Sequence, residues 1–390
     1  MHSELLLKES RDLILILPCA AFLYYVVAAV CARRFFRHAP NQTSGFTPPV
    51  SVLKPVRGVD REAYENFASF CSLDYPEYEI LFGVSDPRDP VVPIIQRLIQ
   101  DFPRRRIRLY TGMAKLGPND KASVLAHLAR EASYEILVVS DSDTRATSDC
   151  LRAIAAPFHT SEVGAVTCLY RGVSAKTFGD TMEALGISSD FFGGVFVAQQ
   201  FAGARFALGA TMAITRKRLE EIGNFEALAE FLLDDFELGR RIAALGYRVE
   251  LIAYSAAMVL PSQTWRAFWQ RQLRWAVGVR HANPWAHLGL LLTQGLPFTV
   301  LAVAACRSAG EAATYISAYF VSRYAMAFSV GLWGLQDSVL RKRWWLVPVR
   351  DALSFGTWLA SIPNSRVSWR GKAFYVREGR LIPDEVADSR

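Results

Sequence analysis

The sequence lacks the cysteine spacing of a disulfide framework or a zinc site. Its six cysteines are scattered singly along 390 residues, and no Cys-x-x-Cys pair occurs. Isolated cysteines of this kind favour reduced thiols in a cytosolic setting. The chain also has no internal repeat and no low-complexity tract, so nothing in it indicates a repeat architecture.

The first apolar segment lacks the marks of a cleaved signal peptide. Residues 13–32 are almost wholly apolar and long enough to cross a bilayer as a helix. A signal peptide has its positive charges before the apolar stretch and a small-residue cleavage site after it, whereas here three arginines follow within 33–37. The positive-inside rule therefore predicts a membrane anchor whose following residues are cytoplasmic.

The composition agrees with partial residence in lipid. Hydrophobic residues make up 51% of the chain and the mean hydropathy is +0.15, which is more apolar than is usual for a soluble enzyme. The net charge of +7 suits anionic lipid headgroups. It would equally suit nucleic acid, so charge alone does not choose the partner, and the motifs below lead us to expect no nucleic acid.

Apolar character returns after residue 285. Residues 288–305 and 312–335 are each near spanning length, and Arg323 interrupts the second. A further apolar piece contains Arg350 and Asp351, and this charged pair favours an interfacial or re-entrant segment over a full crossing. A buried helical core is the alternative for all three.

Between the apolar ends, strand-like runs alternate with helical patterns, which predicts a mostly parallel α/β sheet with helices on both faces. The candidate strands are 50–53, 78–84, 107–110, 136–140, 163–169 and 249–253, and the candidate helices are 63–71, 92–102, 121–131, 148–158 and 235–245. Ligands of such sheets bind at the carboxyl ends of the strands.

The chain is thus expected to have seven parts. They are an N-terminal transmembrane anchor (1–32), a basic juxtamembrane linker (33–49), a cytoplasmic catalytic domain (50–260), an amphipathic interfacial helix (261–285), transmembrane helices (286–335), a basic junction with an interfacial or re-entrant segment (336–366) and a C-terminal tail (367–390).

Carboxylates follow two of the predicted strands. Asp86 comes just after 78–84, and Asp141 and Asp143 come directly after 136–140. Two hard oxygen ligands at a strand end are what Mg²⁺ or Mn²⁺ prefers beside a diphosphate. A solvated turn is the alternative for an Asp-x-Asp triplet, but the strand context favours the metal site.

A third acidic site opens a predicted helix at Asp234 and Asp235. Acidic residues at a helix N-terminus stabilise it, which accounts for one of the two. Adjacent carboxylates repel, which raises the pKa of at least one and makes it a candidate general base.

An aromatic and basic helix is expected over 265–275. It carries Arg271 and Arg274 one turn apart, followed by Trp275. The arginines suit a diphosphate, and the tryptophan suits packing near an acceptor. An interfacial helix whose arginines meet lipid phosphates is the alternative, and the two interpretations are compatible.

Taken together, these motifs resemble the inverting glycosyltransferases of processive and ceramide type, which have the GT-A fold. Their pattern is a lone Asp, then Asp-x-Asp, then an acidic base, then (Gln/Arg)-x-x-Arg-Trp. The corresponding residues here are Asp86, Asp141-Ser142-Asp143, Asp234-Asp235 and Arg271-Gln272-Leu273-Arg274-Trp275.

Closer likeness is to the ceramide glucosyltransferases and to bacterial hopanoid-pathway transferases of N-acetylglucosamine. The segments that carry this likeness are 50–60, Asp74-Tyr75-Pro76, Asn119-Asp120-Lys121, 166–172 and 367–371. The likeness covers nearly the whole chain. Two departures stand out: animal ceramide enzymes have Gly where this chain has Asp143, and 186–194 lacks a histidine that they carry.

The resemblance implies a role for each motif. The implied roles are a nucleoside pocket lined by Lys54 and Pro55, a contact of Asp86 with the uracil ring, a phosphate contact of Lys121, contacts of Asp141 and Asp143 with metal and ribose–diphosphate, contacts of Arg271, Arg274 and Trp275 with donor and acceptor, and a general base at Asp235.

The resemblance further implies a multi-pass enzyme of the cell membrane that uses Mn²⁺ or Mg²⁺ and moves glucose from UDP-glucose onto a primary hydroxyl of ceramide with inversion. Three alternatives stay open: transfer of N-acetylglucosamine to a hopanoid polyol, glycosylation of another lipid such as diacylglycerol, and a non-enzymatic peripheral lipid-binding protein. A processive polysaccharide synthase is disfavoured, because it needs more spanning helices. The sequence leaves the oligomeric state open.

Overall fold

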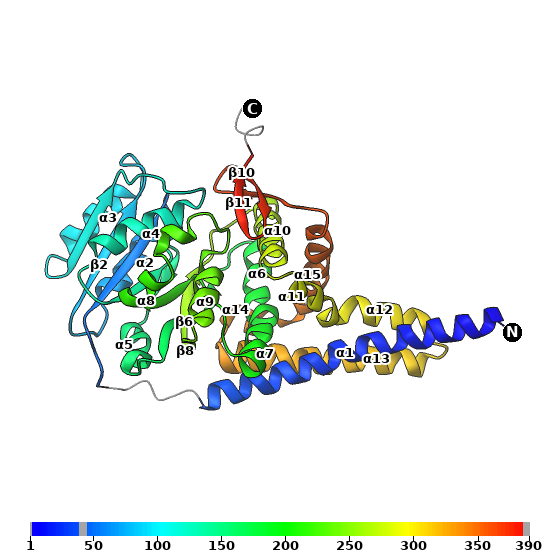
Figure 1. Cartoon of the computed structure of the whole chain (residues 1–390). Coiled ribbons are helices and arrows are strands. Elements are labelled where there is room, and N and C mark those ends of the chain that lie inside the picture. The colour runs from blue at the N-terminus through cyan, green and yellow to red at the C-terminus, as the bar shows by residue number, and fades with distance from the viewer. Residues whose placement is uncertain (1, 39–44, 385–390) are drawn as a thin grey trace.

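The computed structural model describes residues 2–38 and 45–384. They form an α/β domain, a small C-terminal sheet beside it, and a helical arm that runs away from the domain toward the N-terminus (Figure 1).

The α/β domain is built on an eight-stranded sheet with the order β3-β2-β1-β4-β7-β6-β8-β5. Its strands are β1 Val50–Val56, β2 Tyr78–Val84, β3 Arg106–Thr111, β4 Ile136–Ser140, β5 Thr144–Arg145, β6 Val163–Val173, β7 Thr211–Thr215 and β8 Arg248–Val259. Strand β7 is antiparallel to both neighbours and β5 is antiparallel to β8, while the other pairings are parallel. The sheet is therefore mixed but mostly parallel. The sequence pattern did not predict β7 or β5, and β5 has only two residues.

Helices cover both faces of this sheet. They are α2 Ala63–Cys71, α3 Val92–Asp101, α4 Asp120–Glu131, α5 Cys150–Ala155 with the 3₁₀ turn η1 Ala156–His159, α8 Arg216–Glu221, η3 Phe225–Leu228 and α9 Asp234–Ala244. Successive strand residues point to opposite faces, so Val52 of β1 packs in the core with α2, α3 and α5, whereas Leu53 packs in the core with α4, α8 and α9. Burial on both faces explains why the central strands are continuous apolar runs.

Close packing sets the position of α4, which carries Lys121. A Cβ added at Gly83 of β2 would lie 2.4 Å from Cγ1 of Val124, so only glycine lets the helix approach this strand. Asn119 caps the helix by accepting a hydrogen bond from the Ala122 amide. The start of α4 is thereby held at the carboxyl edge of the sheet.

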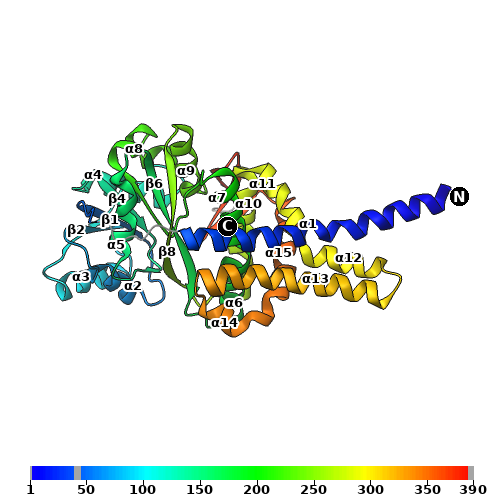
Figure 2. The same ribbon diagram turned by 90° about the horizontal axis from the view of Figure 1, so that it is seen from below.

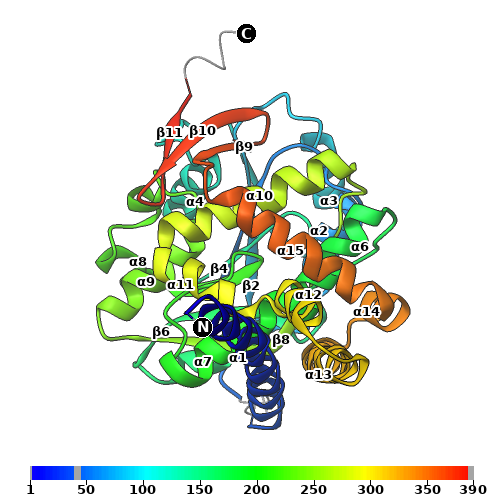
Figure 3. The ribbon, with the colours of Figure 1, turned by 90° about the vertical axis from the view of Figure 1, so that its right-hand side faces the viewer.

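A second helical layer is formed by the segment between β6 and β7 and by helices that follow β8. Its members are α6 Phe178–Gly186, the π-helix η2 Ile187–Phe191, α7 Phe192–Ala202, α10 Trp265–Ala282, α14 Ser338–Arg343, η6 Trp344–Leu346 and α15 Val347–Ser361. The predicted interfacial or re-entrant segment of 336–366 contains α15, which packs against α6 and α10. Figure 3 shows α10 and α15 crossing on the side of the domain toward the arm.

The predicted C-terminal tail is a folded three-stranded antiparallel sheet up to residue 383. Its strands are β9 Arg366–Trp369, β10 Lys372–Arg377 and β11 Arg380–Pro383. Backbone hydrogen bonds tie it to the segment before α9, from Leu232 N to Gly379 O at 2.9 Å and from Leu381 N to Glu230 O at 2.7 Å. Residues 385–390 of the predicted tail lie outside the described residues.

The arm consists of α1 (His2–His38), α11 (Pro284–Gly289) with the 3₁₀ turn η4 (Leu290–Thr293), α12 (Gly295–Ala305), α13 (Ala309–Ala327) and the π-helix η5 (Phe328–Gly334). In Figure 2, α12 and α13 lie beside α1 and extend with it from the domain. Helix α1 continues through the three arginines to His38, so the first part of the predicted linker is helical. Residues 39–44 of that linker lie outside the described residues.

Within the described residues, one helix is long and apolar enough to cross a membrane, Arg11–His38. A second candidate exists only if the pair 284–293 and 295–305, bent by 46°, counts as one span. Helix α13 does not qualify, so the structure does not show the C-terminal membrane helices predicted over 286–335. Arg323 of α13 is buried in protein, where its Nη2 lies 2.6 Å from Oδ1 of Asp351 and its Nη1 donates to the carbonyl of Ser189.

Candidate active site

A buried lysine holds the Asp-Ser-Asp turn after β4 through hydrogen bonds. Lys54 of β1 is fully buried, and its Nζ donates to the Asp141 carbonyl at 2.9 Å and to Ser140 Oγ at 3.3 Å. The Phe70 ring lies 3.8 Å from the same nitrogen. Burial lowers the pKa of Lys54 to about 7, although the negative charges of Asp141 and Asp143 act to raise it. Lys54 therefore fixes the turn that carries the two aspartates, and Pro55 beside it is buried in the strand.

A second lysine joins the turn to the start of α9. Nζ of Lys121 lies 2.7 Å from Oδ1 of Asp141 and 3.9 Å from Oδ2 of Asp234. Burial alone would lower the pKa of Lys121, but the charges of Asp141, Asp234 and Asp235 together raise it. The lysine therefore stays protonated and positively charged. The tertiary fold thus gathers Asp141, Asp234 and Asp235 around one charge, although about a hundred residues separate the two acidic motifs.

Asp235 belongs to this cluster, and its two carboxylate oxygens have different surroundings: one is hydrogen-bonded and the other lies beside Gly209. Its Oδ1 accepts a hydrogen bond from the Phe236 amide at 2.8 Å. A Cβ added at Gly209 would lie 2.6 Å from its Oδ2 and 3.4 Å from Nζ of Lys121. Burial and the charge of Asp234 raise the pKa of Asp235 to about 6, in spite of Lys121. A carboxylate with this pKa is suited to accept a proton near neutral pH.

Asp234 is held by a hydrogen bond from the cap of α4. It is buried, and its Oδ1 accepts a hydrogen bond from Nδ2 of Asn119 at 3.3 Å. The same Asn119 amide donates to the Phe231 carbonyl at 2.9 Å, so Asn119 links the cap of α4 to the start of α9. Asp234 therefore orients the pair, and Asp235 is the member whose Oδ2 lies beside Gly209.

Asp143 is half-buried in the same turn, near a carboxylate that sequence reasoning missed. Burial and the charges of Asp141 and Asp60 raise the pKa of Asp143 to about 7. Asp60, in the loop after β1, accepts a hydrogen bond from Ser142 between the two aspartates. These three carboxylates repel one another, and a cation bound among them would reduce the repulsion.

A metal ion would have few protein ligands here. The parts of the chain that the structure describes contain no group of three or more His, Cys, Asp or Glu side chains arranged to hold a metal. Asp141 and Asp143 nevertheless fit the way in which Mg²⁺ is commonly bound, through one or two carboxylates and the phosphates of a substrate.

Asp86 lies apart from the carboxylate cluster. It is exposed on the loop after β2, and its Oδ1 accepts a hydrogen bond from the Arg88 amide at 2.9 Å, which together with the charge of Arg88 lowers the pKa of Asp86. The next acidic residue, Asp89, accepts a hydrogen bond from the Gly58 amide at 2.8 Å and joins this loop to the loop after β1. Asp86 thus lies exposed on the rim of the carboxyl edge, and its Oδ1 is 3.6 Å from Nε of the exposed Arg88.

Of the two arginines of α10, Arg271 lies near enough to Asp143 for its charge to oppose the rise in the pKa of that carboxyl. Nη1 of Arg271 lies 3.0 Å from Oε1 of Glu183, a fully buried residue of α6. Arg274 lies on the side of the C-terminal sheet, with the Trp369 ring 5.8 Å from its guanidinium. Among the described residues Arg274 forms no ion pair. Trp275 is half-buried on the same helix.

A third arginine joins these two from the C-terminal sheet. Burial, with the charges of Arg271 and Arg370, lowers the pKa of Arg274 to about 10. Arg370 lies in the β9–β10 turn, and its Nη1 donates to the Arg57 carbonyl at 3.2 Å. The sequence predicts no separate role for Arg370 beyond the family likeness of 367–371, because nothing local shows that this residue returns to the first loop of the sheet.

A doubly covered, mostly parallel sheet with carboxylates and lysines at its carboxyl edge is the architecture of a Rossmann-like glycosyltransferase. A mannosyltransferase of Pyrobaculum calidifontis, solved in complex with GDP-Man and Mn²⁺, has this fold, with a TM-score of 0.52 and 19% identity over 90% of this chain and 98% of that one.

The chain belongs to glycosyl transferase family 21, whose model matches residues 13–382. It is 25% identical to ceramide glucosyltransferase 3 of Caenorhabditis elegans over 255 residues, which are 65% of this chain and 55% of that protein. It is also 25% identical to a beta-monoglucosyldiacylglycerol synthase of Trichormus variabilis over 62% of this chain and 51% of that protein. The chain spans about half the length of these curated relatives. The resemblance predicted from the motifs is confirmed.

Proposed function

We propose that this chain transfers glucose from UDP-glucose to a primary hydroxyl of a membrane lipid, with ceramide as the first candidate acceptor. The observation that carries the proposal is the cluster of Asp141, Lys121, Asp234 and Asp235 at the carboxyl edge of the sheet, in a member of family 21. Diacylglycerol is the second candidate, because a relative of similar identity is a monoglucosyldiacylglycerol synthase.

Asp235 is the general base of the proposed reaction. Its Oδ2, beside Gly209, accepts the proton of the lipid hydroxyl as that oxygen attacks the anomeric carbon. The hydroxyl oxygen forms the new glycosidic bond, the bond from the sugar to the diphosphate breaks, and UDP leaves with both electrons of that bond. One displacement inverts the configuration, so an α-linked UDP-glucose yields a β-linked glucolipid.

Asp141 and Asp143 are the residues proposed to hold a divalent cation with the donor diphosphate. Such an ion, when bound, stabilises the negative charge that develops on the leaving phosphate. Lys54 keeps the Asp141 backbone in place from below and, being fully buried, acts on the donor only through this turn. Lys121 sets the direction of the Asp141 carboxylate and keeps Asp235 ionised by its own charge.

Three arginines are proposed to receive the diphosphate on its other side. Arg271 is oriented by Glu183, whereas Arg274 and Arg370 are mutually repelling cations without a carboxylate among the described residues. An anion between them removes this repulsion, and planar guanidinium groups suit phosphate oxygens. Asp86, exposed at the rim, is proposed to contact the uracil ring.

A lipid acceptor is favoured by the route from the site to α1. Tyr170 of β6 lies near enough to Asp235 for that charge to raise the pKa of its hydroxyl, after the larger effect of burial. Its ring is 5.1 Å from Phe192, which is 6.1 Å from Phe196, which in turn is 5.0 Å from Phe35 of α1. Aromatic contacts therefore join the proposed base to the end of the apolar helix, where a lipid hydroxyl is expected to lie.

The test is product identification with the full chain in membranes. UDP-glucose, UDP-galactose and UDP-N-acetylglucosamine are each offered with ceramide, diacylglycerol and a hopanoid polyol, and the glycolipids are identified by mass spectrometry. A β-glucosylceramide or β-glucosyldiacylglycerol supports the proposal, and a product carrying only N-acetylglucosamine on the hopanoid replaces it. Absence of any glycolipid together with absence of UDP binding leaves a lipid-binding protein without transferase activity.

The base is tested separately with Asp235→Asn. This change keeps the shape of the side chain and removes the proton acceptor, so glycolipid formation is expected to stop while UDP affinity stays within a few-fold. Loss of UDP binding in this variant would give Asp235 a structural role instead.

A further inference from the structure

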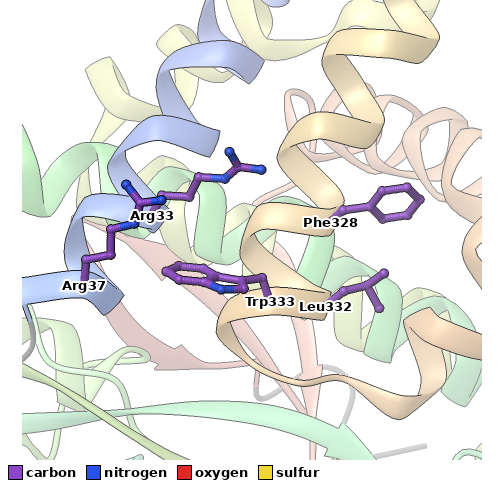
Figure 4. A pocket seen from close by; sticks show the side chains of 5 residues that line it. All are labelled: Arg33, Arg37, Phe328, Leu332 and Trp333. Carbon is purple, nitrogen blue, oxygen red and sulfur yellow. The ribbon is translucent and has the colours of Figure 1, made fainter.

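A pocket of about 390 Å³ lies between the end of α1 and η5, apart from the candidate active site. Arg33 and Arg37 line it from α1, and Phe328, Leu332 and Trp333 line it from η5. In Figure 4, Trp333 extends from η5 toward the two arginines. One wall is therefore cationic and the other is apolar.

The arginines of this pocket are available to a ligand. They lie one turn apart on α1 and so present their guanidinium groups on one face of the helix. Nε of Arg33 donates to Ser329 Oγ at 3.1 Å. Neither arginine forms an ion pair with any carboxylate whose side chain the structure describes. Two exposed guanidinium groups without a carboxylate are a donor set for a phosphate group.

The apolar wall packs closely against α1. The Phe36 and Trp333 rings meet edge to face at 5.8 Å. A Cβ added at Gly334 would lie 2.1 Å from Cε2 of Phe36, so only glycine allows η5 to approach so near. Trp333 is nevertheless 48% exposed, on a π-helix, a rare element that is frequent at functional sites.

The pocket lies at one end of the candidate membrane-spanning helix. Arg33 and Arg37 come directly after the apolar part of the one helix that qualifies as a span, Arg11–His38. Basic residues and tryptophan at such a junction lie at the level of the lipid headgroups. A free phosphate ion would use the arginines alone, whereas a lipid also uses the apolar wall.

We propose that this pocket binds the headgroup region of an anionic phospholipid. The phosphodiester lies between Arg33 and Arg37, and the adjoining carbon chain packs on Phe328, Leu332 and Trp333. The lipid is a resident one and not the acceptor, because no carboxylate lines the pocket to take a proton from a hydroxyl. The inference rests on the proposed membrane placement of α1 and is independent of the transfer chemistry.

The experiment uses the full chain in a neutral detergent and measures retained lipid by native mass spectrometry. Phosphatidylglycerol is titrated against phosphatidylcholine. Wild-type protein is expected to prefer phosphatidylglycerol, and Arg33→Gln with Arg37→Gln to lower that preference on the order of tenfold, the effect of losing charge-assisted hydrogen bonds. The matched control is Arg34→Gln with Arg341→Gln, because it removes the same charge from exposed arginines that do not line the pocket.

Three outcomes overturn the proposal: an equal loss of preference in the two double variants, no loss in either, and displacement of the lipid by inorganic phosphate alone. The single variant Arg37→Gln repeats the test without breaking the bond to Ser329, so a folding defect is distinguishable. Trp333→Ala is compared with Trp345→Ala, a similarly exposed tryptophan outside the pocket, and only the first is expected to weaken retention.

Sugar transfer in neutral detergent is measured on the same samples. The pocket variants are expected to keep the basal turnover, because none of the altered residues belongs to the proposed active site. Absence of transfer in the wild type would count against the proposed function and not against the pocket.

Discussion

The sharpest test of the proposed base is a single methyl group at Gly209. Its Cβ would lie 2.6 Å from Oδ2 of Asp235, whereas ordinary contacts begin near 3.4 Å. The carboxylate and the Gly209 backbone must therefore separate by about 0.8 Å in Gly209→Ala, the difference between these two distances. A displacement of about 1 Å at a reacting group costs on the order of a hundredfold in rate, or about 2.7 kcal/mol in activation free energy.

The assay compares kcat for glycolipid formation with the affinity for UDP. In Gly209→Ala we expect kcat to fall about a hundredfold while the Kd of UDP stays within a few-fold, because the methyl group faces Asp235 and Lys121 and not the uracil rim. The matched control is Gly194→Ala in α7, whose Cβ would meet only Tyr24 Oη at an ordinary 3.6 Å. Full kcat in Gly209→Ala, with UDP binding and melting temperature unchanged, would refute the placement of the base.

Three further predictions follow from the same structure. Asp235 must be ionised to accept a proton and its pKa is raised to about 6, so kcat is expected to fall about tenfold per pH unit below pH 6, measured as a pH profile; a flat profile to pH 5 would remove Asp235 from this role. Arg370→Gln is expected to weaken UDP binding about tenfold by calorimetry, through loss of a charge-assisted phosphate contact, whereas Arg377→Gln, an exposed arginine of the same small sheet, leaves it unchanged; equal affinities would place Arg370 outside the donor site. Arg323→Met leaves Asp351 buried without its partner and is expected to cost about 3–5 kcal/mol in unfolding free energy, while Arg323→Met with Asp351→Leu recovers most of it; a single variant as stable as the wild type would show that the pair is dispensable.

Local patterns predicted most of the sheet and its two acidic strand ends. The strands at 78–84 and 136–140 have the predicted bounds, because buried central strands are unbroken apolar runs. The pattern did not predict β7, which runs antiparallel to both neighbours, and the structure does not show the spanning helices that apolar composition indicated over 286–335. Apolar residues of a membrane helix and of a buried helix look alike in sequence, and only the folded chain shows that Arg323 is paired with Asp351.

The sequence by itself determined the chemistry that is available: an apolar helix followed by arginines, aspartates at the ends of strands, and an aromatic, basic helix. These are properties of neighbouring residues, set by periodicity and charge. The tertiary structure alone decided which groups meet. It placed Lys121 between Asp141 and the pair at 234–235, set Gly209 against the proposed base Asp235, and returned Arg370 to the first loop of the sheet. Such meetings depend on how the strands are ordered and how closely the backbones pack, which no short stretch of sequence records.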